Sequence, residues 1–581
     1  MLGAWPSGGP YGPQRVDYEV PAKAASVYYV APDGDPEAEG STLSKPTTLA
    51  AAIGRVRTGD AVILRGGIYR TGSMELNQGI YLQPYRDEQP VLKGTEVATE
   101  WQGLANGLWR TSWSKLFPSA PDTWWRRFRH GHETPLYWFN NDMVFIDGRL
   151  LEPAGWEGEV DANSYFINYE EEMVYIGTNP DGHLVEITAH DNALTRVITP
   201  VHGKEPDRLG PKIRGITFTQ YAYRALEIEA NEPVGPADPS TYGKEVVGTL
   251  LENVSITFCS RVAAYLRGDG LVIRNCLVSD TETEGLYIIS SNNVLLERNI
   301  IRRNNMQKMT GYFPSAVKIF NQSHNVTCRD NLVVENPNSS GIWYDVGNVD
   351  GLFVDNWIEE CTDGFFFEIS KGAIAAGNVF VNCEKGVRAL NSCDVQVYNN
   401  TFINSMAAFE RTTRSAVNDH FGWHPATGPD VDERDGHVFV NNLLLADEQY
   451  HRILLHVHQV PELCGVLMES QMKRSDFNVY VRSGAHPAEP GYGWSPVPGD
   501  SCYVETDSLD ELRELAPGFG KHSREWADYA GPVLQSILLR NLRPLSGFPG
   551  NSVAGPIDEA VLEILGWEEN PASPGAFPVL E

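Results

Sequence analysis

Two acidic residues, Asp345 and Glu368, have the types and the spacing to perform chemistry together. They are 23 residues apart, and each follows a short apolar run. If the chain coils once in that distance, adjacent strands place the two carboxyl groups roughly 5 Å apart, a separation that suits the nucleophile and the acid/base of a glycosidase. Like charges at that distance raise one pKa, as a general acid requires. We expect the longer Glu368 to be the acid/base and Asp345 the nucleophile or the base that activates water.

Six further side chains belong to the same predicted strip. Side chains alternate between the two faces of a strand, and a shift of register by one residue would bury several charges together. The outward positions therefore form two columns: Lys318, Trp343, Phe366 and Arg388 in one, and Phe320, Asp345, Glu368 and Leu390 in the other. We expect the first column to bind substrate on an exposed strip, because exposed aromatic rings pack well on the apolar faces of sugars.

Two non-catalytic interpretations of the same residues stay open. Lys318 and Arg388 would neutralise the carboxylates if the strip is only a surface ion ladder. The stacked carboxylates would alternatively hold a calcium ion, since neighbouring coils offer oxygen ligands at suitable spacing. No cofactor is required by the hydrolytic hypothesis, and no Cys/His cluster has the spacing of a zinc site.

A long insertion after Asn400 supplies additional candidates, because long loops on a rigid scaffold often carry function. The residues expected to contact substrate there are Arg411, Arg414, Asp419, His420, Trp423 and His424. Asp419 or Asp430 would replace one member of the stacked pair if the enzyme inverts configuration. His130, His132 and Glu133 form a weaker signal, because their spacing is not that of a helical zinc motif.

The element that must position these residues is a coil with a period near 22. Seven asparagines, each after a short apolar run, recur at steps of 22 to 32 residues: Asn253, Asn275, Asn299, Asn331, Asn356, Asn378 and Asn400. One strand and one asparagine in each period are typical of a β-solenoid, in which residues one period apart are stacked. Cys361 and Cys383 are 22 residues apart, so we interpret them as stacked core residues and not as a disulfide or a metal pair.

The chain divides into five predicted segments. They are an N-terminal extension (1–25), the start of the β-helix with a capping helix (26–98), an inserted β domain (99–205), coils that carry the active-site face (206–480), and a C-terminal tail that packs on the β-helix (481–581). The expected fold class is all-β. Leu49, Ala52, Ile53 and Val56 share one side of the predicted cap.

The overall charge limits the class of partner. The formal net charge of −30 makes nucleic acid or an anionic membrane an unexpected partner. No apolar run is long enough for a bilayer, and the first residues lack the features of a secretory signal. We expect a secreted or periplasmic protein whose leader is absent from this sequence, with a cytoplasmic location as the alternative. The oligomeric state cannot be predicted.

Residues 26–480 resemble the pectate-lyase-like right-handed parallel β-helix proteins, many of which open with a short helix like that at residues 44–56. Residues 340–346 and 363–370 resemble bacterial β-helix carbohydrate-active enzymes, and the nearest group suggested is glycoside hydrolase family 141, which includes fucosidases and xylanases. The resemblance implies a right-handed parallel β-helix acting on a plant or microbial polysaccharide or oligosaccharide. It assigns no catalytic residue.

Three other functions on this scaffold stay open. A polysaccharide lyase would need a base and a cation for a uronate, and Lys318 has a plausible place for the base. β-Helix lyases of the alginate and chondroitin kind use a lysine and an arginine one coil apart. The position one coil after Lys318 is Trp343, and Arg388 is roughly 14 Å from Lys318 by strand spacing. A non-catalytic glycan-binding solenoid would need no paired acid, and an epimerase is a further alternative.

Overall fold

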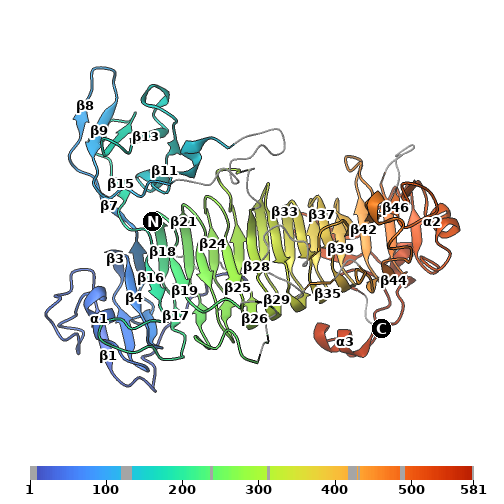
Figure 1. Cartoon of the computed structure of the whole chain (residues 1–581), viewed down its shortest axis with the longest axis horizontal. Helices are drawn as coiled ribbons and strands as arrows, with labels where there is room; N and C mark the ends of the chain where they lie inside the picture. Colours follow the sequence, from blue (N-terminus) through green and yellow to red (C-terminus); the bar gives the residue numbers. More distant parts are fainter. Residues whose placement is uncertain are drawn as a thin grey trace. The chain divides into compact units, whose positions relative to one another are not determined.

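The computed structural model describes residues 9–119, 134–233, 235, 238, 240–309, 314–415, 428–429, 432–483 and 491–578. The strands within these ranges form three long sheets of 13 strands each (Figure 1). Nearly all neighbouring strands of these sheets are parallel, and successive strands of one sheet are separated by one coil of the chain. The chain is therefore a parallel β-helix, as predicted. It divides into two compact units, which are described separately.

The first unit comprises residues 1–231, 243–287 and 299–316. Its first sheet contains β1 (Val27–Val30), β2 (Ala61–Leu64), β5 (Tyr81–Pro84), β17 (Lys212–Arg214), β20 (Leu250–Glu252) and β23 (Val272–Arg274). Its second sheet contains β4 (Met74–Leu76), β16 (Leu194–Arg196), β19 (Leu226–Ile228), β22 (Ala264–Leu266) and the start of β25 (Leu286–Ile289). Its third sheet contains β3 (Gly67–Arg70), β6 (Pro90–Lys93), β18 (Thr217–Tyr221), β21 (Ser255–Cys259), β24 (Leu277–Ser279) and β27 (Ile300–Arg302).

Helix α1 (Leu49–Arg55) forms where the sequence predicted the cap. The Oγ1 atom of Thr48 accepts a hydrogen bond from the Ala51 amide at 3.3 Å and so satisfies one of the free donors of the first turn. Leu49, Ala52 and Ile53 are buried on one side, and Val56 is buried just beyond the helix. The predicted apolar side of the helix is thus confirmed.

The inserted strands form two smaller sheets with their own apolar core. One sheet has β11 (Arg149–Leu150), β10 (Val144–Ile146), β15 (Val185–Thr188) and β7 (Thr95–Val97), and the other has β12 (Glu152–Pro153), β13 (Ser164–Asn168), β14 (Met173–Ile176), β9 (Trp109–Ser112) and β8 (Gln102–Gly103). Val144, Tyr165 and Ile187 are among the residues buried in their core. The coils resume at β16, which pairs with β4 and β19 and lies before the expected boundary at 206.

The second unit comprises residues 232–242, 288–298 and 317–581. Its first sheet contains β26 (Asn292–Glu297), β29 (His324–Arg329), β32 (Val349–Val354), β35 (Lys371–Ala376), β38 (Cys393–Tyr398), β41 (His437–Val440) and β44 (Met472–Asp476). Its second sheet contains β28 (Ser315–Phe320, from Val317 on), β31 (Ser340–Asp345), β34 (Asp363–Glu368), β37 (Lys385–Leu390), β40 (Met406–Arg411), β43 (Leu455–Gln459), β46 (Tyr492–Trp494) and β47 (Val504–Thr506). Its third sheet contains β30 (Leu332–Asn336), β33 (Trp357–Cys361), β36 (Val379–Val381), β39 (Thr401–Ile403), β42 (Leu443–Ala446), β45 (Val479–Arg482) and β48 (Arg524–Trp526).

Parts of the C-terminal segment pack against each of these three sheets. Helix α3 (Glu559–Leu565) buries Val561 and Leu565 against residues of the first sheet. Val533 and Leu534, at the start of the hairpin of β49 (Leu534–Ser536) and β50 (Asn541–Pro544), join the apolar cluster on the third sheet. Helix α2 (Leu509–Leu515) begins after Ser508 and neighbours β46 and β47, the last strands of the second sheet, which also carries Asp345 and Glu368.

A ladder of buried asparagines joins the coils of the second unit. The Oδ1 atom of Asn378 accepts from the backbone and side-chain amides of Asn356 at 2.9 and 3.0 Å. Its Nδ2 atom donates to Phe353 O at 2.8 Å and to Asn400 Oδ1 at 2.9 Å. The same pattern runs through Asn331, Asn356, Asn378, Asn400, Asn442 and Asn478. These bonds fix the register of the coils.

Two asparagines of the predicted series belong to another position. Asn253 and Asn275 have φ angles of 54° and 51°, so they occupy left-handed turns one residue before the ladder position. In the first unit Cys276 takes the ladder position, and its backbone amide donates to Asn299 Oδ1 at 2.9 Å. Asparagine is among the residues that adopt the left-handed conformation most readily. The period predicted from the sequence was therefore correct, but the series of asparagines combined two neighbouring positions of the coil, the left-handed turn and the ladder position after it.

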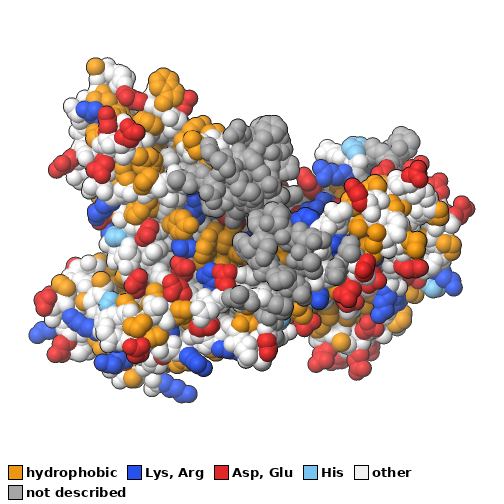
Figure 2. Space-filling view, in the orientation of Figure 1, with side chains coloured by type: hydrophobic (Ala, Val, Ile, Leu, Met, Phe, Trp, Pro, Cys, Tyr) orange, Lys and Arg blue, Asp and Glu red, His pale blue; other side chains and the backbone are white. Residues whose placement is uncertain are grey.

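Acidic and basic side chains are interspersed on the described surface. On the side shown in Figure 2, acidic side chains are scattered, with lysines and arginines among them. None of the helices in the described part of the chain has the length and apolarity that a bilayer span needs.

We predict that replacing Asn378 with alanine lowers the free energy of unfolding by about 3 kcal/mol, because buried amides and carbonyls lose their partners. Chemical denaturation measures the change. Asn541→Ala is the control: Asn541 is exposed and its side chain donates to Gln535 at 2.7 Å, so its loss costs less than about 1 kcal/mol. Equal stabilities for the two variants would contradict the structural role of the ladder.

Candidate active site

The strands β31 and β34 place Asp345 beside Glu368. The two residues are register partners, as are Trp343 and Phe366. The alternate side chains, including Ile342, Phe365 and Val387, are fully buried inside the coil. The predicted register is confirmed, since no shift by one residue is compatible with this pattern.

The turns that follow these two strands have strained backbone conformations. Val346 and Ile369, directly after the two acids, each have a φ of 44°, a left-handed conformation that is rare for β-branched residues. At the equivalent turns of the flanking coils the residues are Asn321 and Asn391. Such strain costs about 1–3 kcal/mol per residue and is found mainly at functional sites. The two strained side chains are buried against each other.

A second polar ladder holds the backbone next to the acids. The Nδ2 atom of Asn348 donates to Asp345 O at 3.0 Å, and the Oγ atom of Ser370 donates to Glu368 O at 2.7 Å. The Asn348 amide donates in turn to Ser370 Oγ at 3.1 Å, and the Ser370 amide donates to Ser392 Oγ at 3.2 Å. The positions of both acids are therefore fixed at the point where each strand ends.

The two carboxyl groups differ in burial and in partners. Glu368 is 2% exposed. Burial, and next the charge of Asp345, raise the pKa of Glu368 to about 7, although Arg414 Nη1 lies 2.7 Å from Glu368 Oε1 and opposes the shift. Asp345 forms an ion pair with Lys318 Nζ at 3.1 Å. Each carboxyl group thus has a cation beside it, Lys318 for Asp345 and Arg414 for Glu368.

The aromatic residues of the strip are not exposed, contrary to the prediction. Trp343 and Phe366 are each 5% exposed, and their rings stack with centroids 4.9 Å apart. The Lys318 ammonium lies 4.0 Å from the Trp343 ring centre, and the Arg388 guanidinium lies 4.6 Å from that of Phe366. The rings gain more by stacking on each other beneath two cations than by facing water. They position Lys318 and Arg388 and do not form an open sugar platform.

Arg388 belongs to a neighbouring ion network. Its Nε atom lies 2.7 Å from Glu410 Oε2, and its Nη1 atom lies 3.5 Å from Asp363 Oδ2. Burial opposes the ionisation of Glu410, but His456, Arg388 and Lys385 outweigh it and lower the pKa of Glu410. The ion ladder that we considered from the sequence is therefore present in part: Lys318 pairs with Asp345, whereas Arg388 pairs outside the carboxyl pair.

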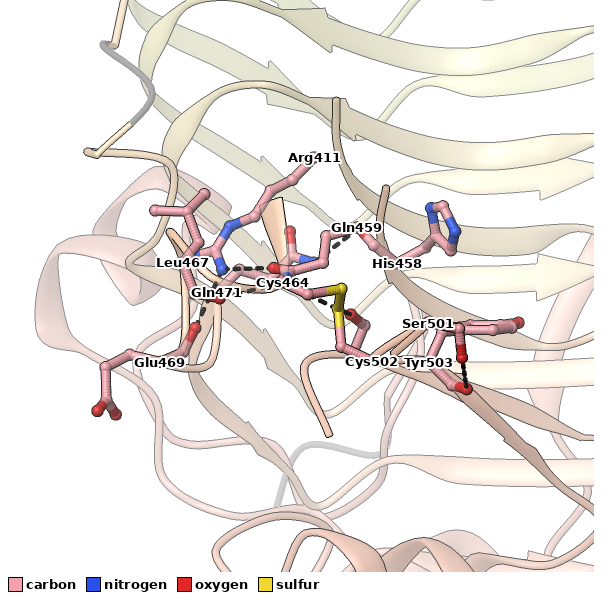
Figure 3. The surroundings of a disulfide bond; sticks show 11 residues. Arg411, His458, Gln459, Cys464, Leu467, Glu469, Gln471, Ser501, Cys502 and Tyr503 are labelled. Atoms are coloured by element: carbon pink, nitrogen blue, oxygen red, sulfur yellow. Dashed lines mark hydrogen bonds between the residues drawn. A yellow bond between two sulfur atoms is a disulfide. The ribbon is translucent and has the colours of Figure 1, made fainter. Parts of the chain in front are cut away.

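The residues predicted in the long insertion have different outcomes. Arg411 is 2% exposed and donates to backbone and side-chain oxygens of Arg434, Gln459 and Glu469, so its expected role in substrate contact is wrong (Figure 3). Arg414 reaches Glu368, as described above. The other candidates lie outside the described residues: Asp419, His420, Trp423, His424 and Asp430, together with His130, His132 and Glu133.

Three residues on the same sheet were missed by the sequence analysis. His456 and His458 lie on β43, where they are the register partners of Ala408 and Glu410. Tyr503 packs edge-on against both imidazoles. The alternation of residues 455–459 would have placed both histidines on the outward face. The position of Tyr503 was not predictable, because it depends on a disulfide between Cys464 and Cys502 that the sequence did not suggest.

Metal binding finds no support in the described ranges. Within them, no group of three or more His, Cys, Asp or Glu side chains is arranged to hold a metal ion. Cys361 and Cys383 are buried free thiols, which confirms their assignment to the core.

Comparisons with known proteins agree with the fold. Residues 242–402 match the family model of the right-handed beta helix region. No curated protein matches the chain.

Solved structures similar to this chain include several proteins with carbohydrate-related descriptions. A complex of XylC with xylose has 13% identity, covers 79% of this chain and 76% of its own, and has a TM-score of 0.46. Pectate lyase Pel9A has 13% identity, coverages of 96% and 97%, and a TM-score of 0.38. The family 28 exopolygalacturonase of Yersinia enterocolitica has 12% identity, coverages of 79% and 72%, and a TM-score of 0.28. Similarity at this level carries no argument about activity.

We predict that Glu368→Gln stabilises the protein at pH 8 relative to the wild type. Because the folded-state pKa of Glu368 is about 7 and its usual value is 4.5, the folded state holds a proton that the unfolded state releases between these pH values. The wild type therefore loses stability as the pH rises through this window, on the order of 2–3 kcal/mol. Glutamine removes that loss.

Denaturation curves at pH 4.5 and pH 8 check this prediction. The stability difference between wild type and Glu368→Gln should grow with pH. Glu360→Gln, an exposed change in the same unit, should show no such growth. A constant difference at the two pH values would mean that Glu368 titrates normally.

Proposed function

We propose that this protein is a glycoside hydrolase in which Glu368 is the general acid and Asp345 is the carboxylate that faces the developing positive charge. The observation that carries the proposal is the buried carboxyl pair, in which Glu368 has a pKa of about 7 while its neighbour is ion-paired with Lys318. Two carboxyl groups with divergent protonation are the requirement of acid-assisted glycoside cleavage.

The residues act on the substrate as follows. Glu368 holds a proton near neutrality and donates it to the glycosidic oxygen, so the leaving sugar departs as an alcohol. Asp345 remains anionic beside Lys318 and stabilises the positive charge at the anomeric carbon. Water supplies the hydroxyl group that completes hydrolysis, and its remaining proton returns to the Glu368 carboxylate.

Elimination is less well supported than hydrolysis. Lys318, the candidate base, is already engaged, because its Nζ atom lies 3.1 Å from Asp345 Oδ2 and 4.0 Å from the Trp343 ring centre. The cations Lys318, Arg388 and Arg414 each have a carboxylate partner within the described residues. We therefore favour a neutral sugar over a uronate as the substrate.

The site also supports catalysis over simple glycan binding. A non-catalytic solenoid gains nothing from a buried carboxyl group with a shifted pKa or from strained turns beside it. We further propose that the protein works outside the cytoplasm, because disulfides such as Cys464–Cys502 persist mainly in oxidising compartments.

We predict that Asp345→Asn and Glu368→Gln each lower kcat by at least about 100-fold, since each removes one of two cooperating groups. Turnover is measured on a panel of neutral polysaccharides and oligosaccharides. Mass analysis of the products identifies the reaction, because hydrolysis adds one water and elimination leaves an unsaturated sugar that absorbs ultraviolet light.

Glu360→Gln is the matched control and should retain full turnover, since Glu360 is exposed outside the site. Near-normal turnover of both active-site variants would exclude the assignment. An unsaturated product would replace the hydrolase with a lyase.

A further inference from the structure

A partly exposed aromatic group lies on the same sheet as the carboxyl pair. The rings of His456 and His458 stack with centroids 5.3 Å apart, and the Tyr503 ring stands edge-on to both at 5.6 and 5.0 Å. All three side chains are partly exposed, whereas Trp343 and Phe366 are buried. Phe320, on β28 of the same sheet, is partly exposed as well.

Several features of the fold hold Tyr503 in this place. Gly493 leaves the space that Tyr503 fills, because a Cβ atom on Gly493 would lie 2.3 Å from the Tyr503 hydroxyl and 2.9 Å from His456 Cδ2. Cys502, the preceding residue, is bonded to Cys464 (Figure 3). The Nε2 atom of Gln459 donates to Cys502 Sγ at 3.3 Å and ties the bridge to β43. The aromatic group is thus a fixed arrangement.

Two members of the group, His458 and Tyr503, are uncharged at neutral pH. Burial, and then the neighbouring His456, lower the pKa of His458, so its imidazole stays neutral. Burial raises the pKa of Tyr503, which keeps its hydroxyl protonated, and that hydroxyl donates to Glu505 Oε1 at 3.0 Å. Glu410, whose Oε1 atom is 3.7 Å from His456 Nδ1, is neutralised by Arg388.

We propose that His456, His458 and Tyr503 form a binding subsite for a neutral sugar ring, separate from the ring cleaved at Glu368. Aromatic faces with ring nitrogens and a hydroxyl at their edges match a sugar, which has an apolar face and a rim of hydroxyl groups. The ligand class rests on the proposed function.

The position of the subsite implies an extended substrate. His458 lies three strands beyond Glu368, which is roughly 14 Å along the sheet at the usual strand spacing. A single sugar does not bridge that distance, so the subsite binds a ring further along an oligosaccharide. Chain length should therefore affect binding.

The first test measures binding without turnover. Glu368→Gln protein labelled with ¹³C at the histidine rings is titrated with cello-, xylo-, manno- and galacto-hexaoses, and the signals are assigned with His456→Gln and His458→Gln. We expect one series to shift the His456 and His458 signals and to leave His183, an exposed residue of the other unit, unchanged. Binding that leaves both signals unchanged, or no binding by any hexaose, overturns the subsite.

The second test separates the subsite from the catalytic pair. His458→Ala and Tyr503→Ala should raise KM for the hexaose about 10-fold with kcat nearly unchanged, and should leave the cleavage of aryl monosaccharides unaltered. Gly493→Ala should act similarly by displacing Tyr503, with a melting curve to show that the fold persists. His183→Gln is the control. Equal losses on short and long substrates overturn the proposal.

Failure of one proposal is distinguishable from failure of the other. Histidine shifts in a Glu368→Gln protein that still turns over would leave the subsite and remove the catalytic assignment. Loss of turnover without histidine shifts would have the opposite meaning.

Discussion

The register of successive coils is the constraint on which the rest of this structure depends. The residues near the proposed site are brought together from several coils, so a slip of one residue in any of these coils would turn its outward side chains into the core. Hydrophobic packing alone sets this register loosely, because Val, Ile and Phe are interchangeable in a broad core. The buried amide ladder sets it strictly, since each asparagine must meet both the coil before it and the coil after it.

The carboxyl pair shows burial and charge acting in the same direction. Desolvation disfavours a charged Glu368, and the neighbouring Asp345 disfavours it again, so Arg414 reduces the shift without cancelling it. Glu410 lies two coils further along the sheet. There a histidine and two cations outweigh burial and lower the pKa of the carboxyl group. Both glutamates are buried on one face of the coil, and the difference between their pKa shifts comes from the charged groups beside them.

Much of the fold was predictable because the solenoid is periodic. The period gave the strands, the inward and outward sides of β31, β34 and β37, and the stacking of Asp345 on Glu368. The burial of the Trp343 and Phe366 rings was not predictable. It depends on the packing of these rings against each other and beneath two cationic side chains. The burial of Arg411 depends on oxygens contributed by residues 434–469, and Tyr503 depends on a disulfide. These long-range partners leave no periodic signal in the sequence.

The ladder bonds have a uniform length although the coils do not. Asn356 and Asn378 are 22 residues apart, and Asn400 and Asn442 are 42 apart. In both pairs the backbone amide of the first residue donates a hydrogen bond of 2.9 Å to Oδ1 of the second. A coil can therefore lengthen at its turns by a whole loop while its strands stay where they are. For a lineage of such proteins, insertions and deletions in these turns offer a route to new substrate preferences in which the scaffold and its acids are inherited unchanged.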